Sequence, residues 1–266
     1  MRVAFESHLS ARPQWHKLSV PMCSFMISIQ PVVLTTPDWK QRAIDIARPF
    51  GESQHFCEPI IHCDNNHLGA AMSSLQAIQN ACRAGSHVLF LEDDLVVDSS
   101  APERISAVDF PDDVAVISFC DMREIPEFSE DGLYSCSALG SDGFGWWGNQ
   151  ALLIHRESAR MLALSDWFSA EIEASKGLRS HRILYEDDGR NCSDIRMALL
   201  VHHHGAPRSR YAVHVPSLLL HVGNESRCFP GRRLGERQTR NWIGDRRKPR
   251  LQPLPAWAGP GLPSAG

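Results

Sequence analysis

The sequence VLFLEDDLVV at residues 88–97 constrains the fold of this chain more than any other stretch. Apolar residues run directly into three consecutive carboxylates, Glu92, Asp93 and Asp94, and apolar residues then resume at once. A short apolar run rich in β-branched and aromatic side chains is typical of a buried strand in an α/β sheet. Ionised carboxylates at the end of such a strand repel one another and are costly to bury. The pattern therefore predicts a divalent cation with oxygen ligands at the carboxyl edge of a sheet, where open α/β folds bind their ligands.

The surrounding sequence predicts alternating strands and helices. Apolar runs at residues 25–36, 59–64, 114–120, 150–154 and 211–222 are strand-like. Apolar residues at helical spacing follow Asp38 and recur at residues 68–84, 157–164 and 193–201. This order predicts an α/β fold with a mostly parallel central sheet and helices on both faces.

Composition favours one main domain. With 266 residues and 43% hydrophobic residues, the chain can bury one substantial core. We expect an N-terminal arm at residues 1–23, a domain at residues 24–228, and a basic and then Pro/Gly-rich tail at residues 229–266. No apolar run reaches the roughly 20 residues of a membrane span, so no integral membrane segment is expected.

The N-terminus and the cysteines indicate a cytoplasmic protein. Residues 1–20 have no continuous apolar core and make a poor signal peptide. The eight cysteines are scattered without a CxxC pair, which favours reduced thiols. An exported protein with disulfides remains the alternative.

Charge is distributed unevenly along the chain. Residues 227–250 carry a net charge of +7, whereas the rest of the chain carries −11. A basic segment on an acidic body indicates a polyanionic partner, such as nucleotide phosphates, nucleic acid or an anionic surface. The alternative is a solvated basic tail.

A second group of acids, Glu186, Asp187 and Asp188, follows about 90 residues after the first. A carboxylate within hydrogen-bond reach of an acceptor hydroxyl can take its proton, so Asp187, or else Asp188, is the candidate general base. The alternative is that these acids cap a helix, where the helix dipole favours negative charge.

Two further segments contain candidate ligands. His221 ends an apolar run and can complete the coordination of a metal, while Gly223 and Ser226 allow backbone and hydroxyl groups to approach a diphosphate. In the glycine-aromatic loop at residues 143–148, Trp146 and Trp147 offer flat faces for a sugar or a base. A structural histidine and tryptophans buried in the core are the respective alternatives. The run His202-His203-His204 is not expected to bind metal, because adjacent helical side chains point in different directions.

The order of these motifs resembles that of GT-A-fold glycosyltransferases, which use nucleotide-sugar donors. LFLEDDLVV resembles their DXD motif, and PSLLLHVG at residues 216–223 resembles the C-terminal His–Gly segment of inverting members, including N-acetylglucosaminyltransferase-type and phage-encoded ones. The resemblance covers roughly residues 25–227 and implies a GT-A, Rossmann-like domain.

The resemblance also implies roles for individual residues. Thr35, Thr36 and Asp64 would contact the uridine half of the donor, Gly223 and Ser226 would lie near the diphosphate, and Asp187 would be the base. Asp94 and His221 would bind Mn²⁺ or Mg²⁺. The first motif position is Glu92 where the family has Asp, so the resemblance assigns the metal to Asp93 or Asp94 instead.

The implied activity is metal-dependent, inverting transfer of a sugar from a UDP-sugar to an acceptor hydroxyl. The basic segment favours 5-hydroxymethylpyrimidine in DNA as acceptor, as in phage DNA-modifying enzymes working in the host cytoplasm. A saccharide or lipopolysaccharide acceptor is the alternative. A nucleotidyltransferase or a nucleotide-binding protein with a similar carboxylate site is the alternative of a different class.

Overall fold

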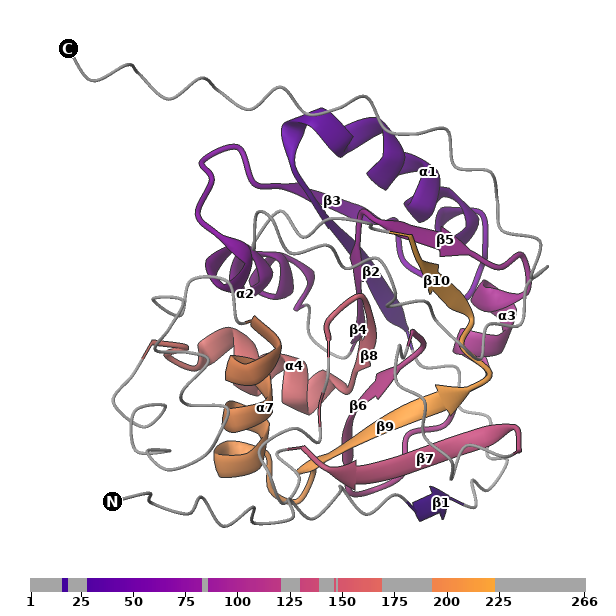
Figure 1. The fold of residues 1–266 in the computed structure, drawn as a ribbon, viewed down its shortest axis with the longest axis vertical. Coiled ribbons are helices and arrows are strands. Elements are labelled where there is room, and N and C mark those ends of the chain that lie inside the picture. Colours follow the sequence, from indigo (N-terminus) through magenta and orange to yellow (C-terminus); the bar gives the residue numbers. More distant parts are fainter. Residues whose placement is uncertain are drawn as a thin grey trace, which may run out of the picture.

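The computed structural model describes residues 16–18, 28–82, 86–120, 130–138, 146, 148–168 and 193–222. These residues form an α/β fold around an eight-stranded sheet with the strand order β1-β7-β9-β6-β8-β4-β2-β3 (Figure 1). The strands are β1 (His16–Leu18), β2 (Ile29–Thr35), β3 (Ile60–Cys63), β4 (His87–Glu92), β6 (Val114–Ser118), β7 (Gly132–Ser137), β8 (Ala151–Ile154) and β9 (Arg210–Val215). A separate two-stranded ribbon pairs β5 (Leu95–Val97) with β10 (Leu219–His221).

The sheet is mixed rather than mostly parallel in its pairings. β2 is parallel to β3 and β4, and β6 is parallel to β9. β8 lies between β4 and β6 and is antiparallel to both, while β7 is antiparallel to β9 and β1.

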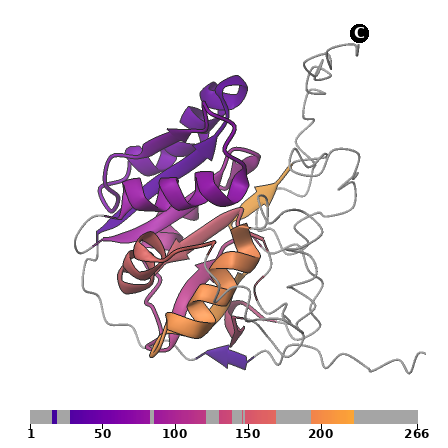
Figure 2. The ribbon, with the colours of Figure 1, turned by 90° about the vertical axis from the view of Figure 1, so that its left-hand side faces the viewer.

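Helices cover both faces of the sheet, as the sequence predicts. On one face α2 (Ala70–Ala81), α4 (Arg156–Leu164) and α7 (Ser193–His204) contact one another, and on the other face lie α1 (Lys40–Gly51) and α3 (Ala101–Ser106) (Figures 1 and 2). A short 3₁₀ helix, η1 (Pro37–Trp39), precedes α1.

β4 has the apolar character of a strand that is buried on both sides. Val88 and Phe90 pack into the core under α2, α4 and α7, whereas Leu89 and Leu91 pack into the core under α1 and α3. All four side chains are fully buried. A strand between two helical layers needs apolar side chains on both faces, which is why its sequence does not alternate.

The structure corrects the predicted boundaries of several strands. Residues 88–97 are two strands, because Asp93 and Asp94 form a turn between β4 and β5. Residues 211–222 are likewise two strands, β9 and β10. Pro31 lies inside β2, which is accommodated because β3 pairs with β2 only from Val32 onward. β7 was not predicted, and β1 belongs to the segment expected to be an arm.

No helix among the residues that the structure describes has the length and apolar character needed to cross a membrane.

Candidate functional site

The turn between β4 and β5 presents its carboxylates at the edge where the parallel strands end. β10 pairs antiparallel with β5, with His221 opposite Leu95, and the Val222 N–H donates to the Asp94 carbonyl oxygen at 2.9 Å. The chain between β9 and β10 is held against the end of β6, since the N–H groups of Leu218 and Leu219 both donate to the Phe119 carbonyl. The ribbon therefore fixes the end of β10 directly beside the acidic turn.

The two residues predicted to bind a metal lie in contact. His221 Nε2 is 2.8 Å from Asp94 Oδ2, and the His221 side chain is buried. The other carboxylate oxygen, Asp94 Oδ1, is also buried and has no hydrogen-bond partner among the described residues. A buried acceptor without a donor is costly, and a cation would satisfy it. Asp94 and His221 thus fit a divalent metal in ligand type and position.

Among the described residues, the protein side chains do not form a complete set of ligands for such a metal. Within residues 28–82, 86–120, 130–138, 148–168 and 193–222, no three His, Cys, Asp or Glu side chains form a group ready to hold a metal ion. Mg²⁺ typically binds through one or two carboxylates and takes its remaining ligands from water and phosphate. An incomplete set of protein ligands is therefore compatible with a metal that also binds a nucleotide diphosphate.

Asp93 is oriented by the neighbouring strand. The buried Thr35 hydroxyl donates to Asp93 Oδ2 at 2.6 Å, because β2 and β4 are parallel neighbours and Leu34 pairs with Glu92. Thr36 follows directly, and its carbonyl accepts a hydrogen bond from the Trp39 N–H at 3.0 Å. Thr35 and Thr36, predicted to contact the donor, and Asp93, which the resemblance offers with Asp94 for the metal, are thus brought to the same edge of the sheet.

Glu92 has a strongly altered environment. Burial raises the pKa of its carboxyl well above the usual value, and the nearby carboxylates of Asp94, Asp93 and Asp194 raise it further. A carboxyl group in these surroundings is stable either with a proton or beside a cation.

Asp64 joins the same edge but already has local partners. Its N–H donates to the Thr35 carbonyl at 2.8 Å, while Oδ1 accepts from the Leu68 N–H at 3.0 Å and Oδ2 accepts from the Ser73 hydroxyl at 2.7 Å. Although partial burial acts to raise it, these hydrogen bonds lower the pKa of Asp64. The carboxylate therefore organises the loop that leads into α2, and any contact with a nucleotide would come in addition to that role.

Trp146 occupies the core instead of an open surface. Its side chain is 3% exposed, its ring stacks on Tyr211 with a centroid separation of 5.3 Å, and its Nε1 donates to the Gly148 carbonyl at 3.1 Å. The ring has almost no surface left for a sugar or a base, so the structure does not favour the predicted substrate contact. Trp147, Asp187, Asp188, Gly223 and Ser226 lie outside the described residues.

Asp194 was not predicted as a site residue. It lies at the start of α7, accepts hydrogen bonds from the Gly148 and Ile195 N–H groups at 3.3 and 2.9 Å, and is close enough to Glu92 to raise the pKa of that carboxyl. The sequence showed only an acid after a helix-capping serine. Its proximity to β4 depends on how α7 packs across the sheet.

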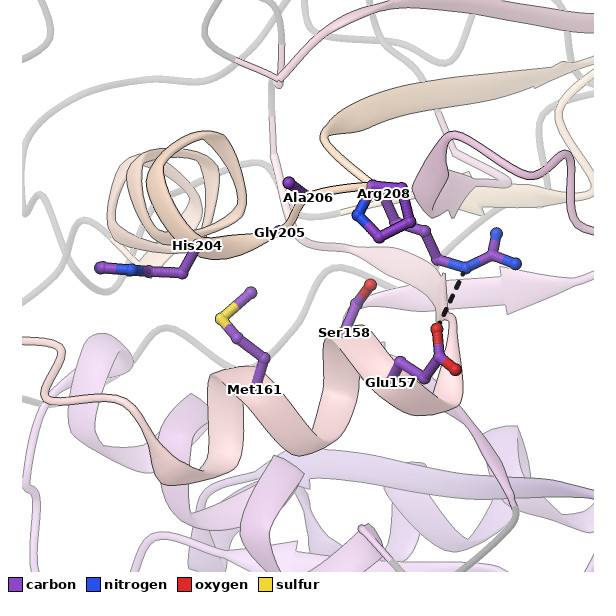
Figure 3. Close-up of a pocket in the computed structure, with 8 residues that line it drawn as sticks. Glu157, Ser158, Met161, His204, Gly205, Ala206 and Arg208 are labelled. Atoms are coloured by element: carbon purple, nitrogen blue, oxygen red, sulfur yellow. Dashed lines mark ion pairs between the residues drawn. The ribbon is translucent and has the colours of Figure 1, made fainter.

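A cavity of about 270 Å³ lies elsewhere, between α4 and the end of α7 (Figure 3). Glu157, Met161, His204 and Arg208 are among its lining residues, and Arg208 Nε pairs with Glu157 Oε2 at 3.5 Å. α4 begins where β8 ends, and Ile154 of β8 pairs with Val88 at the start of β4. The cavity is therefore at the edge of the sheet opposite to Glu92, and it contains none of the clustered carboxylates.

Comparison with known proteins adds no assignment: no protein-family model matches the chain, and no curated protein matches it significantly in sequence.

Proposed function

We propose that this chain is a metal-dependent, inverting glycosyltransferase that moves a sugar from a UDP-sugar to an acceptor hydroxyl. The observation that carries the proposal is the contact between Asp94 and His221, distant in sequence, beside a carboxylate cluster at the carboxyl edge of the parallel strands. Ligands bind at this edge in open α/β sheets. The motif order described above supports the choice of a nucleotide-sugar over other nucleotides.

Each residue of the site has a defined task under this proposal. Asp94 and His221 would hold Mn²⁺ or Mg²⁺, and the Thr35 hydroxyl fixes Asp93 Oδ2 beside them. When bound, the metal would supply positive charge that stabilises the leaving diphosphate. Gly223 and Ser226 border the diphosphate, and Thr36 and Asp64 border the uridine.

Asp187, or else Asp188, takes the proton of the acceptor hydroxyl on the side of the sugar opposite to the diphosphate. The hydroxyl oxygen forms a bond to the anomeric carbon as the bond from that carbon to the diphosphate oxygen breaks, and UDP leaves with the electron pair. One displacement inverts the anomeric centre, in contrast to glycoside hydrolysis, where water is the acceptor.

For the acceptor we propose 5-hydroxymethylpyrimidine in DNA. Residues 227–250 carry a net charge of +7, which suits contacts with backbone phosphates. We expect the enzyme to act in the cytoplasm, including a host cytoplasm if it is phage-encoded.

Mass spectrometry of reactions with Mn²⁺ tests both parts of this proposal. A panel of UDP-sugars is paired with duplex DNA containing 5-hydroxymethylcytosine and, separately, with simple saccharides and lipopolysaccharide. A hexose mass added to DNA together with release of UDP supports the whole proposal. Transfer to a saccharide but not to DNA supports the glycosyltransferase activity and refutes DNA as the acceptor. Release of pyrophosphate from UTP without sugar transfer would identify a nucleotidyltransferase and refute the proposal.

Asp187→Asn separates an enzyme from a nucleotide-binding protein. Loss of the base should lower transfer at least about 100-fold while leaving binding of UDP-sugar nearly unchanged, as measured by calorimetry. If donor binding disappears together with transfer, Asp187 is a ligand or a structural residue and not the base.

A further inference from the structure

The segment Gly148–Asn149–Gln150 connects the glycine-aromatic loop to β8, and its contacts join two parts of the candidate site. The Gln150 carbonyl accepts a hydrogen bond from the Glu92 N–H at 2.9 Å, which ties the segment to the first residue of the carboxylate triplet. Glu92 is the last residue of β4, so this hydrogen bond joins the segment to the strand that leads into the acidic turn.

The other side of the segment is attached to the start of α7. Asn149 Nδ2 donates to Ser193 Oγ at 2.6 Å, and this pair is buried. The Gly148 N–H donates to Asp194 Oδ2 at 3.3 Å. Ser193 and Asp194 thus hold Asn149 and Gly148, and these contacts define the position of the segment relative to α7.

Gly148 is also held from the core. Its carbonyl accepts a hydrogen bond from Trp146 Nε1, and the Trp146 ring packs on Tyr211. Gly148 has φ +78°, a conformation that favours glycine, and a Cβ at this position would meet the Gln150 side chain. The conformation of the segment is therefore dictated by its contacts on both sides.

We propose that Ser193 and Asp194 are positioning residues, which hold residues 148–150 against Glu92 and so set this segment relative to the carboxylate site. The kinetic consequence of this inference, a lower kcat, rests on the proposed glycosyltransferase function. Its structural consequence, the position of residues 148–150, does not.

The chemistry of the two side chains suits this role. As a carboxylate, Asp194 accepts through both oxygens, Oδ1 from Ile195 and Oδ2 from Gly148. Asp194→Asn keeps the shape but leaves one acceptor oxygen, so the contacts with the Ile195 and Gly148 N–H groups can no longer both be made. Ser193→Ala removes the partner of a buried amide group without changing charge.

Hydrogen exchange tests the structural consequence without any substrate. In Asp194→Asn, the amides of Gly148 and Asn149 should exchange about tenfold or more faster than in the wild type, since a hydrogen bond to a charged group is lost. Ser193→Ala should produce a smaller acceleration in the same peptide. Asp166→Asn is the matched control, because Asp166 Oδ1 also accepts a hydrogen bond from a backbone N–H, that of Phe168 at 2.9 Å, but from outside residues 148–150.

Kinetics then distinguish positioning from a general loss of stability. In Asp194→Asn, kcat for sugar transfer should fall about tenfold or more while the Kd for Mn²⁺–UDP changes less than about threefold, because Asp94 and His221 remain in place. Asp166→Asn should change neither quantity. The inference is overturned if the amides of residues 148–149 exchange in Asp194→Asn at the same rate as in the wild type. If exchange accelerates as expected but the wild-type protein transfers no sugar, the attachment stands and the proposed function fails.

Discussion

At the scale of single residues, the contact between Asp94 and His221 decides what the acidic turn can do. Three carboxylates alone would repel one another and depend on solvent for compensation. A buried imidazole at 2.8 Å and a buried, unpartnered Oδ1 of Asp94 among the described residues turn this repulsion into a site that a cation would stabilise. The contact between Asp94 and His221 therefore says more about a cation site than the presence of three adjacent acids.

Asp94→Asn should weaken Mn²⁺ binding about tenfold or more, because the amide loses the negative charge that the cation requires. Mn²⁺ titration followed by electron paramagnetic resonance measures the change. Asp98→Asn is the control, since Asp98 lies just beyond β5 and accepts hydrogen bonds from the Ser100 N–H and hydroxyl. Equal Mn²⁺ affinity in the wild type and Asp94→Asn would exclude Asp94 as a ligand.

Thr35→Val should weaken binding of Mn²⁺–UDP about fivefold, because removal of the hydroxyl leaves Asp93 without a hydrogen bond worth about 1 kcal/mol. Thr35→Ser retains the donor and should bind like the wild type. Isothermal titration calorimetry compares the three proteins. If the serine and valine variants bind equally well, the hydroxyl does not orient Asp93 for the donor.

At the scale of elements, the β5–β10 ribbon positions the site. β10 brings His221 opposite Leu95, and the Val222 N–H extends the pairing to the Asp94 carbonyl. The ribbon shares the sheet edge with β2 and β4, whose parallel pairing places Thr35 beside Asp93. Three segments that are separate in sequence, β2, β4–β5 and β10, therefore converge through backbone pairing rather than through side-chain contacts alone.

Val222→Pro should lower Mn²⁺ affinity about tenfold, because proline has no N–H to donate to Asp94 and restricts the backbone of His221. Val222→Ala keeps the N–H and should leave the affinity nearly unchanged. The same Mn²⁺ titration serves as the measurement. An equal loss in both variants would show that the valine side chain matters and the ribbon hydrogen bond does not.

At the scale of the whole molecule, the edge of the sheet opposite to the carboxylates contains a buried pair of histidines. The rings of His87 and His155 lie 4.8 Å apart, and both contact Phe110. Burial, followed by the positive charge of His155 and nearby arginines, lowers the pKa of His87 to about 3, and burial with Arg208 and Arg156 lowers the pKa of His155 to about 4. Both histidines are therefore neutral in the folded protein above about pH 4.

The contribution of His87 and His155 to the free energy of unfolding should fall as the pH is lowered from about 6.5 toward 4. Below 6.5 the unfolded chain binds protons at both histidines while the folded chain does not, so protonation favours unfolding by at most about 1.4 kcal/mol per pH unit for each group. Urea denaturation at several pH values measures the slope. Above pH 6.5 the two histidines contribute no pH dependence.

His155→Asn should reduce that slope, because asparagine also caps a helix N-terminus but does not titrate. His203→Asn, at an exposed position near the end of α7, is the control and should keep the wild-type slope. If the slope is unchanged in His155→Asn, the buried pair does not account for acid sensitivity.

The regular elements follow from local patterns. α2 and the strands β3, β4, β6 and β8 lie within residues where periodicity or continuous apolar character predicts them. β7 was missed because its sequence, GLYSCS, buries Ser135 and Cys136 and shows no strong apolar pattern. The antiparallel insertion of β8 was missed because apolar character does not specify strand direction.

The sequence by itself determined the α/β class, the carboxylate triplet at a strand end and, through motif resemblance, the pairing of Asp94 with His221. Only the tertiary structure decided that Asp93 is held by Thr35, that Trp146 belongs to the core, and that Asp194 lies near Glu92. The physical reason is that hydrophobic periodicity reports which face of an element is buried, whereas contacts between elements depend on strand order and helix packing. The triplet is thus visible in the sequence, but its surroundings are a property of the fold.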